Sequence, residues 1–284
     1  MKSQWECVLE NLGEWVGSFT TVNDRGELIE DIPSVIELTG VRDDRAIHLV
    51  LKRFYTLPNS TERYAKEVVW DFSTPPGIGA IYFDTGAFSS GAWAVTAGVK
   101  TIAEFSLRAG DRRFRMIQTF DLNQRLDRVT FVREQQQGTT APERPQLQIS
   151  DLLGSWSGTT TTFAADAGVP TITTTESTFT ASNSGYRSAE NGEFVDSIAI
   201  GDPSTVRILQ FSQSGQAYEM LLLPDGGYTT NPREIRLGDP FDLEIGWVHQ
   251  TGQRQRLVRR YDGAGKWAST SFVVDSLADS LEIL

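Results

Sequence analysis

The sequence has very few of the residues on which most catalytic and metal sites depend. Among its 284 residues are one cysteine, Cys7, and two histidines, His48 and His249. A single cysteine excludes an intrachain disulfide and fits a reducing compartment. No Cys-x-x-Cys, His-Glu-x-x-His, Gly-x-Ser-x-Gly or phosphate-cradling Gly-Lys-Ser/Thr motif occurs. We therefore predict no metal site, and no residue is assigned a catalytic role.

Long apolar runs and an excess of positive charge are also missing. No apolar run approaches the roughly 18 residues that span a bilayer, and the first residues contain no apolar core of signal-peptide type. The formal net charge is −11, which opposes nucleic-acid binding, because that affinity depends on neutralising phosphates. We expect a cytoplasmic protein with no membrane span and no nucleic-acid partner.

One sequence pattern occurs twice in the chain. The stretch "NLGEWVGSF" at residues 11–19 nearly recurs as "LLGSWSGTT" at 152–160, so that Leu-Gly-x-Trp-x-Gly occurs twice and Trp15 matches Trp156. The same offset brings "RFRMIQTFD" (113–121) onto "RQRLVRRYD" (254–262). Because separate anchors share one offset, we predict a tandem duplication.

The duplication sets the expected domain boundaries. Residues 139–145 fall in a polar stretch rich in Pro and Gly, "QQQGTTAPERP", which is typical of a linker. We predict an N-terminal unit over residues 1–138 and a C-terminal unit over residues 146–284.

Each unit is predicted to be a short helix followed by strands. Trp5, Val8 and Leu9 have helical spacing, and Ser3 and Glu6 have the spacing of a capping box. Short β-branched or aromatic runs follow, many separated by Gly, Pro, Asn or Asp, which predicts eight to nine strands per unit. Short strands without interleaved helices favour an antiparallel sandwich or barrel.

A short helix followed by Gly-x-Trp at the first strand resembles the opening motif of lipocalins and calycins, and the sequence has it at Trp15 and Trp156. The stretches "QWECVLENLGEWVGSFT", "FDTGAFSSG", "LPDGGYTTNP" and "RQRLVRRYDGAGKW" resemble the cyanobacterial domain-of-unknown-function family 3598 over nearly the full chain. This resemblance implies an all-β fold of two tandem antiparallel calycin/lipocalin-like β-barrels. In such barrels the tryptophan closes the floor and packs on a basic residue of the late strands.

The resemblance also implies a class of ligand. Family 3598 is distantly similar to phycobiliprotein chromophore lyases, which are single calycin barrels that bind an open-chain tetrapyrrole (a bilin) and deliver it to a cysteine of a phycobiliprotein. It occurs in cyanobacteria and in plastid-bearing organisms, which implies the cyanobacterial cytosol or the plastid stroma. A fold hosts many functions, however, so the resemblance determines the fold better than the function.

Two arginine pairs are the sharpest candidates for ligand binding. Arg113 and Arg115 alternate on one strand face, as do Arg254 and Arg256. An interior arginine keeps its charge, so it needs a carboxylate, either an internal Asp or Glu or the propionate of a bound pigment. In bilin lyases a similar late-strand arginine pair is implicated near the bilin. A solvated strand face or an arginine packed on the floor tryptophan are the structural alternatives.

Aromatic residues supply the other candidate contacts. Trp70, Trp93 and Trp247 are predicted to lie within strands, and Tyr228 follows an Asp-x-Gly turn that both copies contain. A flat ring offers stacking area to a conjugated ligand, and core packing is the structural alternative. The second copy has more aromatic and arginine residues near 241–261, so we expect the pocket there.

Three functions remain open at this point. The favoured function is a carrier for a hydrophobic conjugated small molecule, with a bilin as the expected ligand and a photosynthetic protein as an expected partner. The second is a bilin lyase-like or isomerase/cyclase enzyme that uses the barrel cavity. The third is a protein-assembly factor whose barrels are filled by their own side chains.

Overall fold

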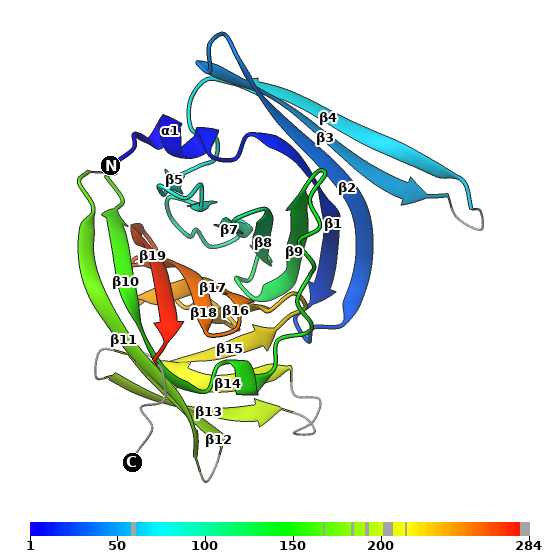
Figure 1. The fold of residues 1–284 in the computed structure, drawn as a ribbon. Coiled ribbons are helices and arrows are strands. Elements are labelled where there is room, and N and C mark those ends of the chain that lie inside the picture. Colours follow the sequence, from blue (N-terminus) through cyan, green and yellow to red (C-terminus); the bar gives the residue numbers. More distant parts are fainter. Residues whose placement is uncertain are drawn as a thin grey trace. The chain divides into compact units, whose positions relative to one another are not determined.

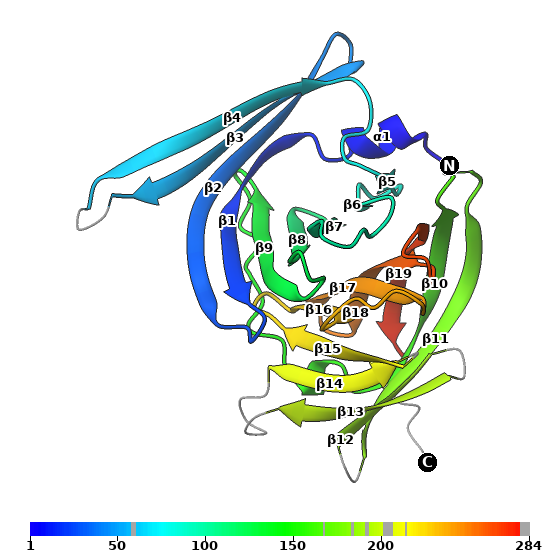
Figure 2. The same cartoon turned by 180° about the vertical axis from the view of Figure 1, so that it is seen from behind.

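The computed structural model describes residues 1–57, 61–166, 168–182, 185–190, 193–200, 207–213 and 215–278. These residues form two antiparallel sheets, as Figure 1 and Figure 2 show from opposite sides. The first compact unit comprises Met1–Ala92, Ile102–Thr119 and Asp127–Glu143, and the second comprises Trp93–Thr101, Phe120–Leu126 and Arg144–Leu284. The expected all-β duplicated fold is confirmed.

The first sheet follows one short helix. Within the described residues it has nine strands in the order β4-β3-β2-β1-β9-β8-β7-β6-β5. The elements are α1 (Gln4–Leu9), β1 (Gly13–Asn23), β2 (Leu28–Val41), β3 (Ala46–Thr56), β4 (Arg63–Phe72), β5 (Ile81–Tyr82), β6 (Phe88–Gly91), β7 (Thr101–Ala109), β8 (Arg112–Phe120) and β9 (Leu126–Gln136). Ser3 and Glu6 form the predicted capping box at the start of α1.

The second sheet is a closed barrel of ten strands, counted over the described part of the chain. Its elements are the short 3₁₀ helix η1 (Ile149–Asp151), β10 (Gly154–Ala164), β11 (Thr171–Ser182), β12 (Gly185–Glu190), β13 (Glu193–Ile200), β14 (Ile208–Gln213), β15 (Gln216–Leu222), β16 (Gly227–Pro232), β17 (Phe241–Gln250), β18 (Gln253–Tyr261) and β19 (Trp267–Leu277). Each strand pairs with the next, and β10 pairs with β19 to close the ring.

The repeated Leu-Gly-x-Trp-x-Gly motif has the same local structure in both copies. Its first glycine has a positive φ, 120° at Gly13 and 124° at Gly154, in the region that favours glycine. The next tryptophan is buried, and its indole N–H donates to a backbone carbonyl, at 3.0 Å for Trp15 and 2.9 Å for Trp156. The glycine thus turns the chain so that each strand begins with its tryptophan in the core.

The last glycine of the motif allows two strands to approach closely. A Cβ atom at Gly17 would lie 1.9 Å from the carbonyl oxygen of Arg133 on the neighbouring strand β9. A Cβ atom at Gly158 would lie 2.0 Å from the carbonyl oxygen of Val274 on β19. No side chain fits at either position, which explains why both copies have glycine there.

The second sheet closes into a barrel, whereas the first sheet, among the described residues, does not. Among the described residues no pairing joins β4 to β5, and β5 has only two residues. Pro75 and Pro76 precede β5, and the offset that relates the two copies places them on Gln216 and Ala217 of β15. Proline lacks an N–H and has a fixed φ, so this segment does not extend the ladder. In the second copy the same positions pair with β14, and the barrel closes with one strand more than the nine at most that the sequence predicts.

Candidate functional site

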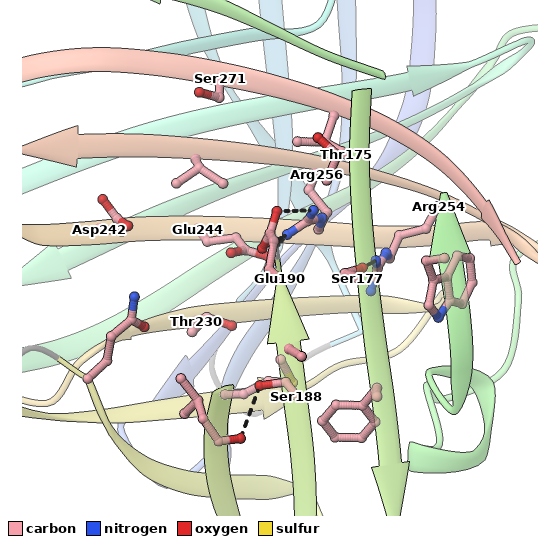
Figure 3. A pocket seen from close by; sticks show the side chains of 18 of the residues that line it. Thr175, Ser177, Ser188, Glu190, Thr230, Asp242, Glu244, Arg254, Arg256 and Ser271 are labelled. Carbon is pink, nitrogen blue, oxygen red and sulfur yellow. Dashed lines mark hydrogen bonds and ion pairs between the residues drawn. The ribbon is translucent and has the colours of Figure 1, made fainter. Parts of the chain in front are cut away.

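A cavity of about 570 Å³ lies among the ten barrel strands of the second unit (Figure 3). Every strand contributes to its wall, and we call it the barrel cavity. Among the described residues its wall includes hydroxyl side chains, namely Thr160, Thr162, Thr173, Thr175, Thr178, Thr230, Ser177, Ser188, Ser197, Ser269 and Ser271. Its charged lining residues are Glu190, Asp242, Glu244, Arg254, Arg256 and Arg260. The wall is therefore more polar than a site for a purely hydrophobic molecule needs to be.

Arg254, one of these charged lining residues, is held in place by contacts with other side chains of the protein. Its Nε and Nη2 donate to the two carboxylate oxygens of Asp275 at 3.0 and 2.7 Å, and Nη2 also donates to Ser177 Oγ at 3.1 Å. Its guanidinium carbon lies 4.4 Å from the ring centroid of Trp156. Only 1% of the Asp275 side chain is accessible. Arg254 thus makes the arginine-on-tryptophan floor contact.

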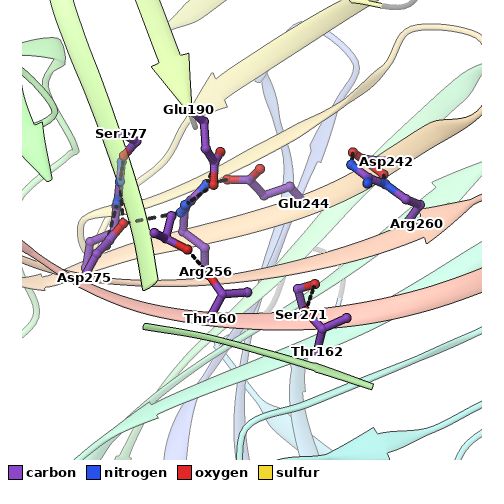
Figure 4. Close-up of polar contacts among 12 residues, drawn as sticks. Thr160, Thr162, Ser177, Glu190, Asp242, Glu244, Arg256, Arg260, Ser271 and Asp275 are labelled. Carbon is purple, nitrogen blue, oxygen red and sulfur yellow. Dashed lines mark hydrogen bonds and ion pairs between the residues drawn. The ribbon is translucent and has the colours of Figure 1, made fainter. Parts of the chain in front are cut away.

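Arg256 makes a different kind of pair (Figure 4). Its Nη1 and Nη2 donate to the two carboxylate oxygens of Glu190 on β12 at 3.0 and 2.8 Å, a bidentate arrangement. The Arg256 side chain is 5% accessible, whereas that of Glu190 is 45% accessible. Burial alone would raise the pKa of Glu190, but the charge and hydrogen bonds of Arg256 hold it below its usual value. The pair therefore joins a buried cation to an accessible anion.

A second glutamate lies beside Arg256. Glu244 Oε1 is 3.9 Å from Arg256 Nη1 and accepts a hydrogen bond from the Tyr228 hydroxyl at 3.2 Å. Burial raises the pKa of Glu244 to about 7, against the smaller opposing effect of Arg256. The Tyr228 ring lies over Gly246 on β17, where a Cβ atom would be 2.0 Å from a ring carbon. Gly246 thus allows the ring to lie across the strand and reach Glu244.

The first unit has a smaller pocket of about 220 Å³, which we call the first-unit pocket. Its lining residues are Val8, Asn11, Ile36, Leu38, Leu49, Trp70, Phe72, Pro76, Gly77, Tyr82, Phe88, Ser90, Glu104, Arg113 and Arg115. Arg113 and Arg115 share the fully buried Glu134, at 2.7 Å and 2.8 Å respectively. Burial alone would raise the pKa of Glu134, but the two guanidinium groups lower it to about 2. Arg113 also lies over Trp15, 4.5 Å from the ring centroid.

The structure places the predicted candidates in different surroundings. Arg254, Arg256 and Tyr228 line the barrel cavity, whereas Arg113, Arg115 and Trp70 line the first-unit pocket. The floor tryptophans, Trp15 and Trp156, are buried beneath arginines, as the family resemblance implies.

Trp247 and Trp93 line neither of these two cavities. Asp242 and Glu244 face the barrel cavity, and Trp247 lies on the opposite face of the same strand because side chains alternate. Its indole N–H donates to the Asp225 carbonyl at 2.7 Å. Trp93 is 56% exposed and lies against Trp267, with ring centroids 5.1 Å apart.

The carboxylates that neutralise the arginines were not identified from the sequence. Glu134 and Asp275 are related by the same offset as Trp15 and Trp156, so the duplication itself held this signal. Glu190 gives no such signal, because its place beside Arg256 depends on how β11 and β12 pair.

Among the described residues no helix is both long and apolar enough to cross a membrane. The same residues contain no group of three His, Cys, Asp or Glu side chains arranged to hold a metal ion.

Two family models match successive parts of the chain. Residues 1–139 match the family model "Domain of unknown function (DUF3598), N-terminal". Residues 143–277 match the model "Biogenesis factor required for ATP synthase 1, C-terminal domain". Comparison with functionally curated proteins finds no match.

Two of the solved structures that match differ widely in their likeness to this chain. A crystal structure of a DUF3598 protein of unknown function from Nostoc punctiforme is 33% identical, with a TM-score of 0.87, over 98% of this chain and 100% of that chain. The S-type phycobiliprotein lyase CPES from Guillardia theta is 11% identical, with a TM-score of 0.37, over 46% of this chain and 91% of that chain. The second likeness is too distant to carry a functional argument.

Proposed function

This chain belongs to the DUF3598 family, and from that premise we propose that its second unit is a carrier for a small molecule that bears a carboxylate group. The favoured ligand class is an open-chain tetrapyrrole. The observation that carries the proposal is the pair of Arg256, which is buried, with Glu190, which is 45% accessible, at the wall of the barrel cavity.

The pair supports ligand binding because one of its members can be exchanged. A ligand carboxylate has the same charge and the same two acceptor oxygens as Glu190. It can therefore accept both hydrogen bonds from the Arg256 guanidinium while the Glu190 side chain turns towards solvent. Arg256 then never stays unpaired in the protein interior. Asp275 does not offer such an exchange, because its side chain is only 1% accessible and is held by Arg254.

The size and lining of the cavity support a ligand with several polar groups. Its volume of about 570 Å³ lies within the roughly 300–1,000 Å³ typical of small-molecule sites. The hydroxyl side chains of the wall can bond carbonyl and N–H groups, and Trp156, Phe179 and Tyr228 offer flat apolar area. The buried hydroxyl of Thr230 has no hydrogen-bond partner among the described residues, and a carotenoid or a simple fatty acid offers few polar atoms to pair with it. A tetrapyrrole with propionate, lactam and pyrrole groups offers more.

The test is the absorption spectrum and native mass of the protein purified from a photosynthetic host. We expect a bound chromophore with a visible band, and we expect Arg256→Ala to lose it while the protein remains folded by circular dichroism. The matched control is Arg187→Ala, which removes an arginine from an exposed pair with Asp196. A colourless protein with the bare chain mass that also fails to take up biliverdin would overturn the proposal.

A second candidate function is protein assembly in the cytoplasm or stroma. The observation that favours it is the match of residues 143–277 to the C-terminal domain of a biogenesis factor required for ATP synthase. The partner would then be a subunit of that complex. Deletion of the gene should lower the amount of assembled ATP synthase on native gels if this function applies. Unchanged assembly of ATP synthase, together with a ligand found in the barrel cavity, would exclude the assembly function and support the carrier function.

A further inference from the structure

We propose that the first-unit pocket is a second binding site, for a small apolar carboxylate such as a single-ring aromatic acid or a branched short-chain acid. This site is separate from the barrel cavity and does not depend on what that cavity binds. The second unit supplies its arginine pair with a carboxylate, Glu190, that has no counterpart in the first unit.

Strand register identifies the missing group. In the second unit Ser177 on β11 pairs with Glu190 on β12, whose carboxylate engages Arg256. In the first unit Ile36, which the repeat offset matches to Ser177, pairs with Leu51 on β3. Leucine therefore stands where the second unit has the glutamate.

The charge balance of the first unit reflects this loss. Arg113 and Arg115 share one fully buried carboxylate, Glu134. The other nearby anion, Glu104, is 3.4 Å from Arg115 Nη1, and its side chain is 33% accessible. In the second unit Arg254 and Arg256 each have their own bidentate carboxylate. The first-unit pocket thus offers its two arginines one carboxylate fewer than the second unit, where Asp275, Glu190 and Glu244 all lie near the pair, and this smaller negative charge favours an incoming anion.

One hydrogen-bond donor of the pair is also unsatisfied. Arg113 is 2% exposed, and its Nη2 has no hydrogen-bond partner among the described residues. Its Nε donates to Glu134 at 2.7 Å, and its Nη1 has only a long contact to Asn11 at 3.4 Å. A buried N–H without an acceptor costs free energy, and a ligand carboxylate would recover it.

The rest of the pocket determines the body of the ligand. Its lining is mostly aliphatic and aromatic, and includes Leu49, Trp70, Phe72 and Phe88. Its volume of about 220 Å³ is below the roughly 300–1,000 Å³ of sites for drug-sized ligands. A tetrapyrrole therefore does not fit, whereas one ring or a short branched chain does. The carboxylate would meet Arg113 and Arg115, and the apolar body would pack on Trp70 and Phe72.

The test compares benzoate with benzyl alcohol, which has the same ring without the charge. Binding is followed by ¹H–¹⁵N spectra of the purified full chain, using the indole resonances of Trp70 in the first-unit pocket and Trp156 in the barrel cavity as reporters. We expect millimolar benzoate to shift the Trp70 resonance and benzyl alcohol to shift it much less.

Two variants of one residue make the test specific. Leu51→Glu restores the internal carboxylate that the second unit has, and we expect it to weaken benzoate binding about tenfold or more, roughly the effect of one charged hydrogen bond. Leu51→Gln has the same size without the charge and should bind benzoate as the wild type does. Equal benzoate affinity in the two variants, equal shifts with benzyl alcohol, or a shift of Trp156 alone would overturn the proposal.

Discussion

Arg254 lies over the ring of Trp156, with its guanidinium carbon 4.4 Å from the ring centroid, and this contact occurs a second time in the chain. Arg113 and Trp15, their counterparts in the first copy, have the same relationship at 4.5 Å. In both units the arginine is then neutralised by a carboxylate of the last strand. The duplicated sequence motif is therefore the visible part of a duplicated buried unit of indole, guanidinium and carboxylate.

The first prediction concerns that carboxylate. Asp275→Asn should lower the free energy of unfolding by about 3–5 kcal/mol, because it leaves Arg254 buried without a counter-charge. Asp196→Asn is the matched control, since it breaks an ion pair whose side chains are 51% and 59% accessible, and its effect should stay below about 1 kcal/mol. Urea denaturation of both variants measures the difference. Similar losses in the two would contradict a structural role for Asp275.

The second prediction concerns the close contact of β10 and β19. Gly158→Ala should destabilise the protein by about 2 kcal/mol or more, because the new Cβ would lie 2.0 Å from a backbone oxygen that has little room to move. Gly168→Ala is the control, because its nearest neighbour would be an aspartate side chain at 3.4 Å, an ordinary contact. Thermal denaturation of the two variants is sufficient, and an unchanged melting temperature for Gly158→Ala would refute the steric argument.

The third prediction concerns the position of the Tyr228 ring. Gly246→Ala should displace this ring, since a Cβ atom there would lie 2.0 Å from it. The hydrogen bond from Tyr228 to Glu244 would then be lost, which a crystal structure of the variant would show. Tyr228→Phe removes the same hydrogen bond without a clash and should cost only about 1 kcal/mol. Equal stability of the two variants would show that the ring has room to adjust.

The fourth prediction is a dependence of stability on pH. Burial raises the pKa of Glu244 from 4.5 to about 7, so the folded protein holds a proton that the unfolded chain releases. The contribution of the Glu244 carboxyl group to the free energy of unfolding is therefore complete below pH 4.5 and is lost as pH rises towards 7. The slope should reach at most about 1.4 kcal/mol per pH unit. Glu244→Gln should remove it, and parallel stability curves for wild type and variant between those pH values would contradict the assignment.

Much of the fold could be predicted because the duplication is visible in single residues. The repeated glycines and tryptophans identify the start of each sheet, and the alternation of Arg254 and Arg256 places both on one strand face. The difference in closure was harder to foresee. It depends on Pro75 and Pro76 interrupting one hairpin that the second copy completes.

The candidate site was predicted less completely, for a physical reason. Arg256 could be identified from its strand, but Glu190 reaches it only through the register of the β11–β12 hairpin, which local sequence does not fix. The position of Trp247 was also hard to predict, because a shift of one residue along a strand moves a side chain from the cavity face to the opposite face. Glu134 and Asp275 could have been found by applying the repeat offset to acidic residues.

The most direct measurement of the central claim is a titration of wild type, Glu190→Gln and Arg256→Gln with biliverdin, followed by visible absorption. If a ligand carboxylate replaces Glu190 on Arg256, Glu190→Gln should bind about tenfold more tightly than wild type, because the internal competitor has lost its charge. Arg256→Gln should bind more weakly by a similar factor. Biliverdin affinities that are equal in all three proteins, or weaker in Glu190→Gln than in wild type, would contradict the account.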